Sequence, residues 1–189
     1  MINYQLPTTV EANGKTWQIR SDYRAILDII TALNDVNLTE QERAYVALKI
    51  FYPQFDEIEP EEANELLKLC YDFIACGEEE DDQKSPKVVD WEQDFRYIVT
   101  PINAVAGKEI RALDYLHWWT FISYYYEING ECMFAQIVNI RDKLARGKTL
   151  DKQEREFYRR NRSKVDLKMR YTAEEEEFLK MWGGVNGTE

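Results

Sequence analysis

The amino-acid sequence predicts a mainly α-helical fold with a single β-hairpin at its N-terminus. Apolar residues recur at helical spacing from about residue 21 onward. Residues typical of strands flank an Asn-Gly dipeptide only within the first twenty residues. At 189 residues, the chain can bury a hydrophobic core without help from disulfides or metals. We therefore expect the hairpin to be followed by about seven to eight helices, arranged in two bundled halves.

The hairpin is expected at residues 8–11 and 16–19, on either side of Asn13-Gly14. Asn and Gly accept the positive φ angles that a two-residue hairpin turn requires. A lone hairpin is only marginally stable in water, so this one should pack on the helices or pair with another chain. Its open strand edges are a candidate contact for self-association.

Three helices are expected between the hairpin and residue 76. Ser21 or Asp22 can cap the first of them. Thr39 and Glu42 have the spacing of a capping box at the start of the second. Pro60 suits the first turn of the third, where its missing N–H would have no helical partner.

Residues 77–87 form the clearest break in the chain. Five consecutive acidic residues, 78–82, repel one another and favour a solvated linker. This linker would divide an N-terminal unit at 1–76 from a helical bundle at 88–182. Residues 183–189 should form a flexible tail.

Five helices are expected after the linker. Asp90 should cap the first, which runs towards Gly107. Pro101 lies inside this helix and should kink or divide it. The other helices are expected at residues 110–126, 132–145, 150–161 and 172–182.

The helix expected at 110–126 is apolar or aromatic around nearly its whole circumference. Such a helix is either central in the fold or part of an interface. Two adjacent tryptophans favour the core because they bury large areas, yet the same surface could hold a partner. This candidate aromatic face, belonging to the core or to a partner site, comprises His117, Trp118, Trp119, Phe121, Tyr124 and Tyr125.

Charge is distributed unevenly along the chain. Residues 141–170 carry 12 basic and 5 acidic side chains, although the whole chain has a net charge of −11. This segment could fold back on the acidic part or form a solvated helix face; it could also dock an acidic partner. Nucleic-acid binding is disfavoured because the rest of the chain would oppose it. The candidate basic docking face comprises Arg141, Lys143, Arg146, Arg155, Arg159, Arg160 and Arg162.

The sequence carries no enzyme signature. Nucleophilic catalysis needs a Ser or Cys beside a His, and His117 is the one histidine. Asp114 should share its helix face and orient its ring. A carboxylate-bridged metal site that adds Asp90 and Asp94 would need a second acid–histidine pair. We therefore expect no catalysis, no metal and no cofactor, with structural roles for the three aspartates.

The lack of recognisable targeting signals and the pattern of cysteines favour a cytoplasmic protein. The N-terminus lacks the basic start and apolar run of a signal peptide. No apolar stretch approaches the roughly 20 residues that cross a bilayer. Cys70, Cys76 and Cys132 fit no metal-ligand spacing and should be free thiols in a reducing compartment.

Several motifs together resemble one protein family. They are the stretch DWEQDFRYI at 90–98, LHWWTF at 116–121, Ile-Arg-Asp at 140–142, Val-Asp-Leu at 165–167, and an opening hairpin that leads into Asp22-Tyr23-Arg24. This set resembles small phage tail-gene products encoded just upstream of the tape-measure gene, in siphophages and prophages of mainly Gram-positive hosts. The resemblance covers roughly residues 5–170. The chain departs from it at 124–130, where it reads YYYEING instead of a Leu- and Phe-rich continuation with a Gly-Leu turn.

The resemblance implies a tail assembly chaperone. Such a protein would bind the aggregation-prone tape-measure protein and keep it soluble while tail-tube subunits polymerise around it. The implied partners are the tape-measure protein and, as a second candidate, the tail-tube protein, with self-association. The implied location is the host bacterial cytoplasm, with absence from the mature virion. The alternatives are a structural tail or connector component, a nucleic-acid-binding regulator that uses 141–170 and, last, a metal enzyme.

Overall fold

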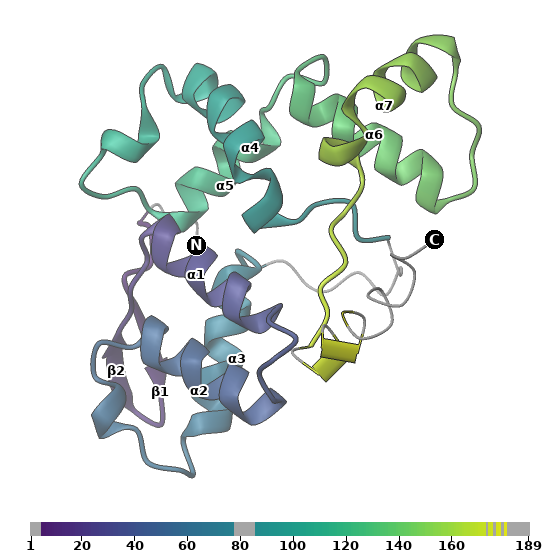
Figure 1. Ribbon diagram of the computed structural model, residues 1–189. Coiled ribbons are helices and arrows are strands. Elements are labelled where there is room, and N and C mark those ends of the chain that lie inside the picture. Colours follow the sequence, from purple (N-terminus) through teal and green to yellow (C-terminus); the bar gives the residue numbers. More distant parts are fainter. Residues whose placement is uncertain (1–4, 78–85, 173, 176, 179, 181–189) are drawn as a thin grey trace.

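In the part of the chain that the computed structural model describes, a two-stranded hairpin is followed by the seven α-helices α1 to α7 (Figure 1). The structure describes residues 5–77, 86–172, 174–175, 177–178 and 180. Within them, the elements are β1 (Thr9–Ala12), β2 (Lys15–Gln18), α1 (Tyr23–Leu33), α2 (Glu40–Phe51), α3 (Ala63–Ile74), α4 (Trp91–Ala106), α5 (Trp118–Tyr126), α6 (Met133–Ala145) and α7 (Lys152–Val165). Short 3-10 turns lie at Phe55–Glu57 and Ile110–Ala112. The predicted fold class is confirmed.

The hairpin forms around the expected turn. Asn13 and Gly14 have φ angles of 52° and 72°, and Ala12 pairs with Lys15. Both strands lie one residue closer to the turn than expected. Trp17 is fully buried and packs edge-on against Tyr52, so the hairpin rests on the chain's own helices. Pairing of its edges with another copy stays a prediction.

The expected caps organise the first two helices. Asp22, and not Ser21, is the N-cap of α1 and accepts a hydrogen bond from the Arg24 N–H. Thr39 and Glu42 form the complete capping box of α2. Helix α3 starts later than expected, at Ala63, so that Pro60 lies in the preceding turn.

Helix α4 is not divided at Pro101. It begins at the N-cap Asp90 and ends at Gly107, whose φ of 68° lies in the left-handed region. Ile98 and Ile102 are fully buried on either side of the proline. The packing of these side chains therefore offsets the free-energy cost of the backbone hydrogen bond that the proline cannot make.

The single helix expected at 110–126 is wrong. Residues 113–117 are not helical, and α5 starts at Trp118 with His117 as its N-cap. The Tyr23 N–H donates to the Leu116 carbonyl (2.9 Å), and the Trp118 N–H donates to the Ser21 carbonyl (2.8 Å). Pairing with the segment before α1 thus replaces the helical hydrogen bonds that the periodicity favours.

The last helices follow the expectation in part. Helix α6 has Cys132 as its N-cap and ends at Ala145, as expected. Helix α7 continues to Val165 through a non-helical Asn161, beyond the expected end at 161. The described residues between 174 and 180 are helical, whereas the expected tail at 183–189 lies outside the described residues.

The main hydrophobic core is continuous across the expected linker. It includes Trp17, Phe73, Trp118 and Phe121, together with Phe134 of α6. A second, smaller core lies between α6 and α7 and consists of Ile137, Ile140, Leu150 and Val165. Residues from both sides of the expected linker thus share the main core, and the division into 1–76 and 88–182 stays a prediction. Most of the expected linker, 78–85, lies outside the described residues.

Candidate partner-binding site

One buried arginine joins three helices. Arg141 of α6 is 5% exposed, and its guanidinium forms a two-pronged ion pair with Asp94 of α4 (2.6 and 3.0 Å). Its remaining N–H groups donate to the carbonyls of Val165 (2.5 Å), Lys164 (2.9 Å) and Val88 (2.9 Å). All five donors of the guanidinium are used. We call this arrangement the Arg141 framework.

Residues 166–170 form a strap across the start of α4. The Gln93 side chain donates to the Asp166 carbonyl (2.9 Å) and accepts from the Lys168 N–H (3.0 Å). Arg170 reaches both oxygens of Asp90 (2.9 and 2.8 Å). The strap is therefore fixed at both of its ends.

Asp90 is both the cap of α4 and the anchor of the strap. It accepts from the Gln93 N–H (3.0 Å), and its own N–H donates to Asp94 (2.9 Å). Burial alone would raise the pKa of Asp90. The hydrogen bond from Gln93 and the charges of Arg170 and Lys87 together outweigh that effect and lower it. The carboxylate is thus held in its charged form.

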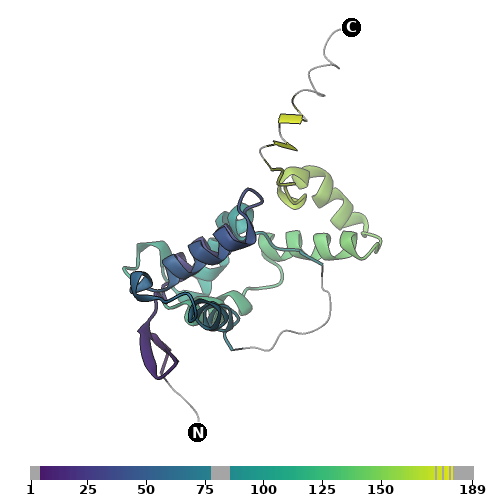
Figure 2. The same ribbon diagram turned by 90° about the horizontal axis from the view of Figure 1, so that it is seen from below.

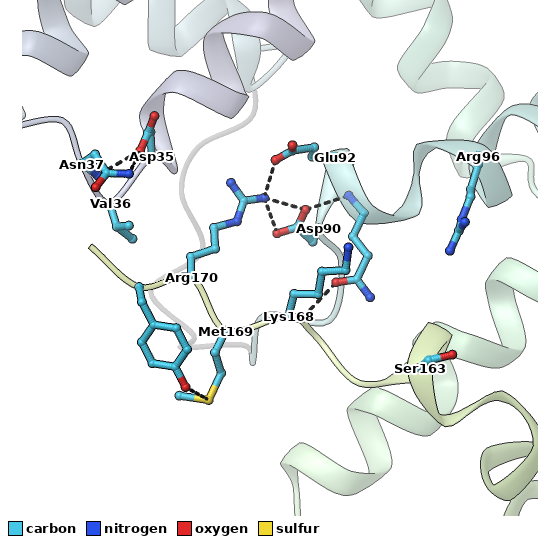
Figure 3. A pocket seen from close by; sticks show the side chains of 12 residues that line it. Asp35, Val36, Asn37, Asp90, Glu92, Arg96, Ser163, Lys168, Met169 and Arg170 are labelled. Atoms are coloured by element: carbon cyan, nitrogen blue, oxygen red, sulfur yellow. Dashed lines mark hydrogen bonds and ion pairs between the residues drawn. The ribbon is translucent and has the colours of Figure 1, made fainter. Parts of the chain in front are cut away.

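A groove of about 520 Å³ lies between the strap, the start of α4 and the turn after α1 (Figure 3). Within it, the guanidinium of Arg170 forms ion pairs with the carboxylates of Asp90 (2.8 Å) and Glu92 (3.0 Å). Arg96 and Lys168 make no ion pair within the described part of the chain. Met169 is 75% exposed. The groove thus offers both signs of charge and an adaptable apolar side chain; its lining is completed by Asp35, Val36, Asn37, Gln93, Ser163 and Tyr171.

The comparison with protein families identifies the chain. A family model described as bacteriophage Gp15 protein matches residues 2–167. The chain belongs to that family. The Gp15 family is a phage tail assembly family. Comparisons with curated proteins and with solved structures give no match.

The motifs that suggested this family meet in space. In this Gp15 family protein, the stretch from Asp90 to Asp94, the Ile-Arg pair and the Val-Asp-Leu motif all contribute to the Arg141 framework and the strap. The opening Asp22-Tyr23 pairs with Leu116-His117, because the Asp22 carboxylate accepts from the Leu116 N–H (2.9 Å). These motifs hold the fold together at two junctions.

The candidate aromatic face lies mainly in the core of the Gp15 family protein. His117, Trp118 and Phe121 are buried, whereas the other three members, Trp119, Tyr124 and Tyr125, are half-buried. The indole N–H groups of Trp118 and Trp119 donate to the carbonyls of Ile74 and Phe73, each at 2.9 Å. These tryptophans therefore fasten α5 to the end of α3.

His117 is oriented by the backbone and not by Asp114. Its Nδ1 accepts from the Trp119 N–H (3.1 Å), which leaves Nε2 as the donor to the Pro7 carbonyl (2.9 Å). This arrangement requires the neutral ring. Asp114 is exposed and outside any helix, so the expected pairing on one helix face is wrong. The helix-capping role of His117 was missed because a histidine is an uncommon N-cap.

The candidate basic face is only partly available to a partner. Arg141 is buried in the framework. Acidic neighbours pair with four other members: Lys143 with Glu154, Arg146 with Asp142, Arg160 with Glu156 and Arg162 with Asp166. Arg155 and Arg159 are exposed and have no ion pair among the described residues. They are the two cations of this face that a partner could bind directly.

Two further sequence expectations concern metals and membranes. Among the described residues, no group of three His, Cys, Asp or Glu side chains is placed to hold a metal ion. No described helix is both long and apolar enough for a membrane span.

The three cysteines are free thiols, as expected. Burial raises the pKa of the Cys70 thiol to about 12.

Proposed function

We propose that this Gp15 family protein is a non-enzymatic tail assembly chaperone that binds the tape-measure protein in the host bacterial cytoplasm. The tail-tube protein is the second proposed partner, and the chaperone would be absent from the finished virion. The observation that carries this proposal is the groove beside the strap, in a member of a phage tail assembly family. The groove is the proposed binding site for the client.

The chemistry of the groove suits a client of mixed charge. A long helical client presents acidic and basic side chains in turn, and the groove offers an exposed anion at Glu92 and exposed cations at Arg96 and Lys168. Complementary charges of both signs steer association and select the partner. Met169 adds an apolar contact that can adapt to different side chains.

The groove walls are held in place before any client binds. The strap is fixed by Gln93 and Asp90, and the Arg141 framework fixes α4 against α6 and α7. A preorganised site loses less conformational freedom on binding. This favours a holding function, in which many copies must bind one long client without rearranging.

Co-expression with the tape-measure protein tests the proposal. We expect the client to be soluble and to co-purify only when this protein is present. The variant R96E/K168E should reduce the co-purified client by at least about tenfold, since it reverses both exposed cations of the groove. Lys108 and Lys148 are exposed and lie outside the groove, so K108E/K148E is the matched control and should retain the client.

Two results would contradict the proposal. One is a client that stays equally insoluble in the presence of the wild-type protein. The other is the recovery of this protein from purified virions in stoichiometric amounts, which would favour a structural tail or connector component. If R96E/K168E and K108E/K148E lost the client to the same extent, the groove would not be the client-binding site.

A further inference from the structure

The chain continues from the strap into an acidic arm, which we define by the described residues Thr172, Glu174, Glu175, Glu177, Phe178 and Lys180. It lies beyond residues 2–167, which match the family. Thr172 starts a helical segment and exchanges hydrogen bonds with Glu175 (2.8 and 3.2 Å). Glu174 and Glu177 are exposed and three residues apart, so they share one helix face. Phe178 is 54% exposed. The arm projects away from the helical body (Figure 2).

The strap keeps this arm away from its own α7. Figure 1 shows α7 and the arm at opposite ends of the strap. Between them, the chain is bonded to α4 at Asp166, Lys168 and Arg170. The arm of one molecule can reach its own α7 only if these bonds break.

Helix α7 presents the complementary charge. Arg155 and Arg159 are exposed, lie one helical turn apart and have no ion pair among the described residues. They are separated by about 6 Å along the helix axis, against roughly 4.5 Å for Glu174 and Glu177 on the arm. Two carboxylates on one helix can therefore meet two guanidinium groups on another, in a helix-to-helix contact.

We propose that the acidic arm of one molecule docks on the Arg155/Arg159 face of α7 in a second copy. The arm and α7 are different surfaces, and each molecule carries one of each, so the contact can repeat from copy to copy. The contact lies outside the groove. A set of linked chaperones would then cover a long client while each groove stays open.

Analytical ultracentrifugation over a concentration series tests this contact. The wild-type protein should exceed its monomer mass of 22.5 kDa at low salt and return towards it as salt screens the charges. The variants R155E/R159E and E174K/E177K should each weaken association by at least about tenfold. The combined fourfold variant reverses both sides of the contact and should regain association. K108E/K148E should associate like the wild type.

The charge swap makes the outcome decisive. A wild-type protein that stays monomeric at every concentration would overturn the proposal, as would unchanged association in both single-sided variants. Failure of the fourfold variant to regain association would also overturn it. Circular dichroism of each variant verifies that the helices remain folded. Because Arg155, Arg159 and the arm glutamates lie outside the groove, loss of self-association is distinguishable from loss of client binding.

Discussion

A guanidinium group is tolerated inside a protein only when its N–H donors find acceptors, and Arg141 meets this condition in full. Local sequence gave a usable signal for its burial. Arg141 follows Ile140 and lies four residues after Ile137, on the side of α6 that packs on α7. The identity of its partner had no such signal, because Asp94 lies 47 residues away.

Replacing Arg141 with methionine should lower the free energy of unfolding by about 3–5 kcal/mol, since Asp94 would keep a buried charge without a partner. Urea denaturation measures this change. The control R146M removes an exposed pair with Asp142 and should change stability little. Similar stability losses in the two variants would contradict a special role for the buried pair.

His117 offers a second test at the level of one side chain. H117A removes the cap of α5 and leaves the Pro7 carbonyl without its donor, and should cost about 1–3 kcal/mol. H117N supplies a side-chain oxygen that can accept from the Trp119 N–H, so it should cost less. Thermal unfolding ranks the two variants. Equal losses would show that the cap contributes little.

At the scale of elements, the hairpin turn was predictable, and so were the helix starts that a short polar side chain caps. Asn13-Gly14, the Thr39–Glu42 box and Asp90 all function as expected, because their chemistry is local. The start of α5 was not predictable in this way. The start of α5 depends on the hydrogen bond from the Tyr23 N–H to the Leu116 carbonyl. Because Tyr23 is far from Leu116 in the sequence, no local pattern predicts this bond.

The Asp90 anchor should make the strap and α4 sensitive to acid. The pKa of Asp90 is lowered in the folded protein, so its stabilising effect is complete above the ordinary aspartate pKa of about 3.9. That effect is lost as pH falls through the lowered folded pKa. D90N keeps a capping side chain but cannot pair as an anion with Arg170.

Urea denaturation of wild type and D90N at several pH values measures this effect. The stability difference between them should be constant at and above about pH 5 and should shrink as pH falls further. Carboxylates far from Asp90 cancel in the difference, which therefore reports Asp90 together with Glu92, its neighbour on Arg170. A difference that does not vary between pH 7 and pH 3 would exclude the ion pair as the cause.

At the scale of the whole molecule, the division into 1–76 and 88–182 stays a prediction, and the packing shows what periodicity leaves open. Periodicity shows which face of a helix is apolar, yet it does not show which other helix covers that face. Phe73 and Trp119 lie on opposite sides of the acidic segment and stack at 5.7 Å. The acidic composition of 77–87 predicts a linker, whereas aromatic side chains from the two sides of this segment are in contact.

The two cores are joined through the Arg141 framework, and this predicts how the molecule opens. In R141M, amide hydrogens of α6 and α7 should exchange faster with deuterium, because the smaller core keeps only its own few apolar contacts. Helices α1, α2 and α5 should keep most of their protection, since their core does not depend on Arg141. Hydrogen exchange read by mass spectrometry distinguishes this from a uniform loss. Uniformly faster exchange would mean that the two cores unfold as one unit, and that the framework stabilises the whole molecule instead of connecting two parts.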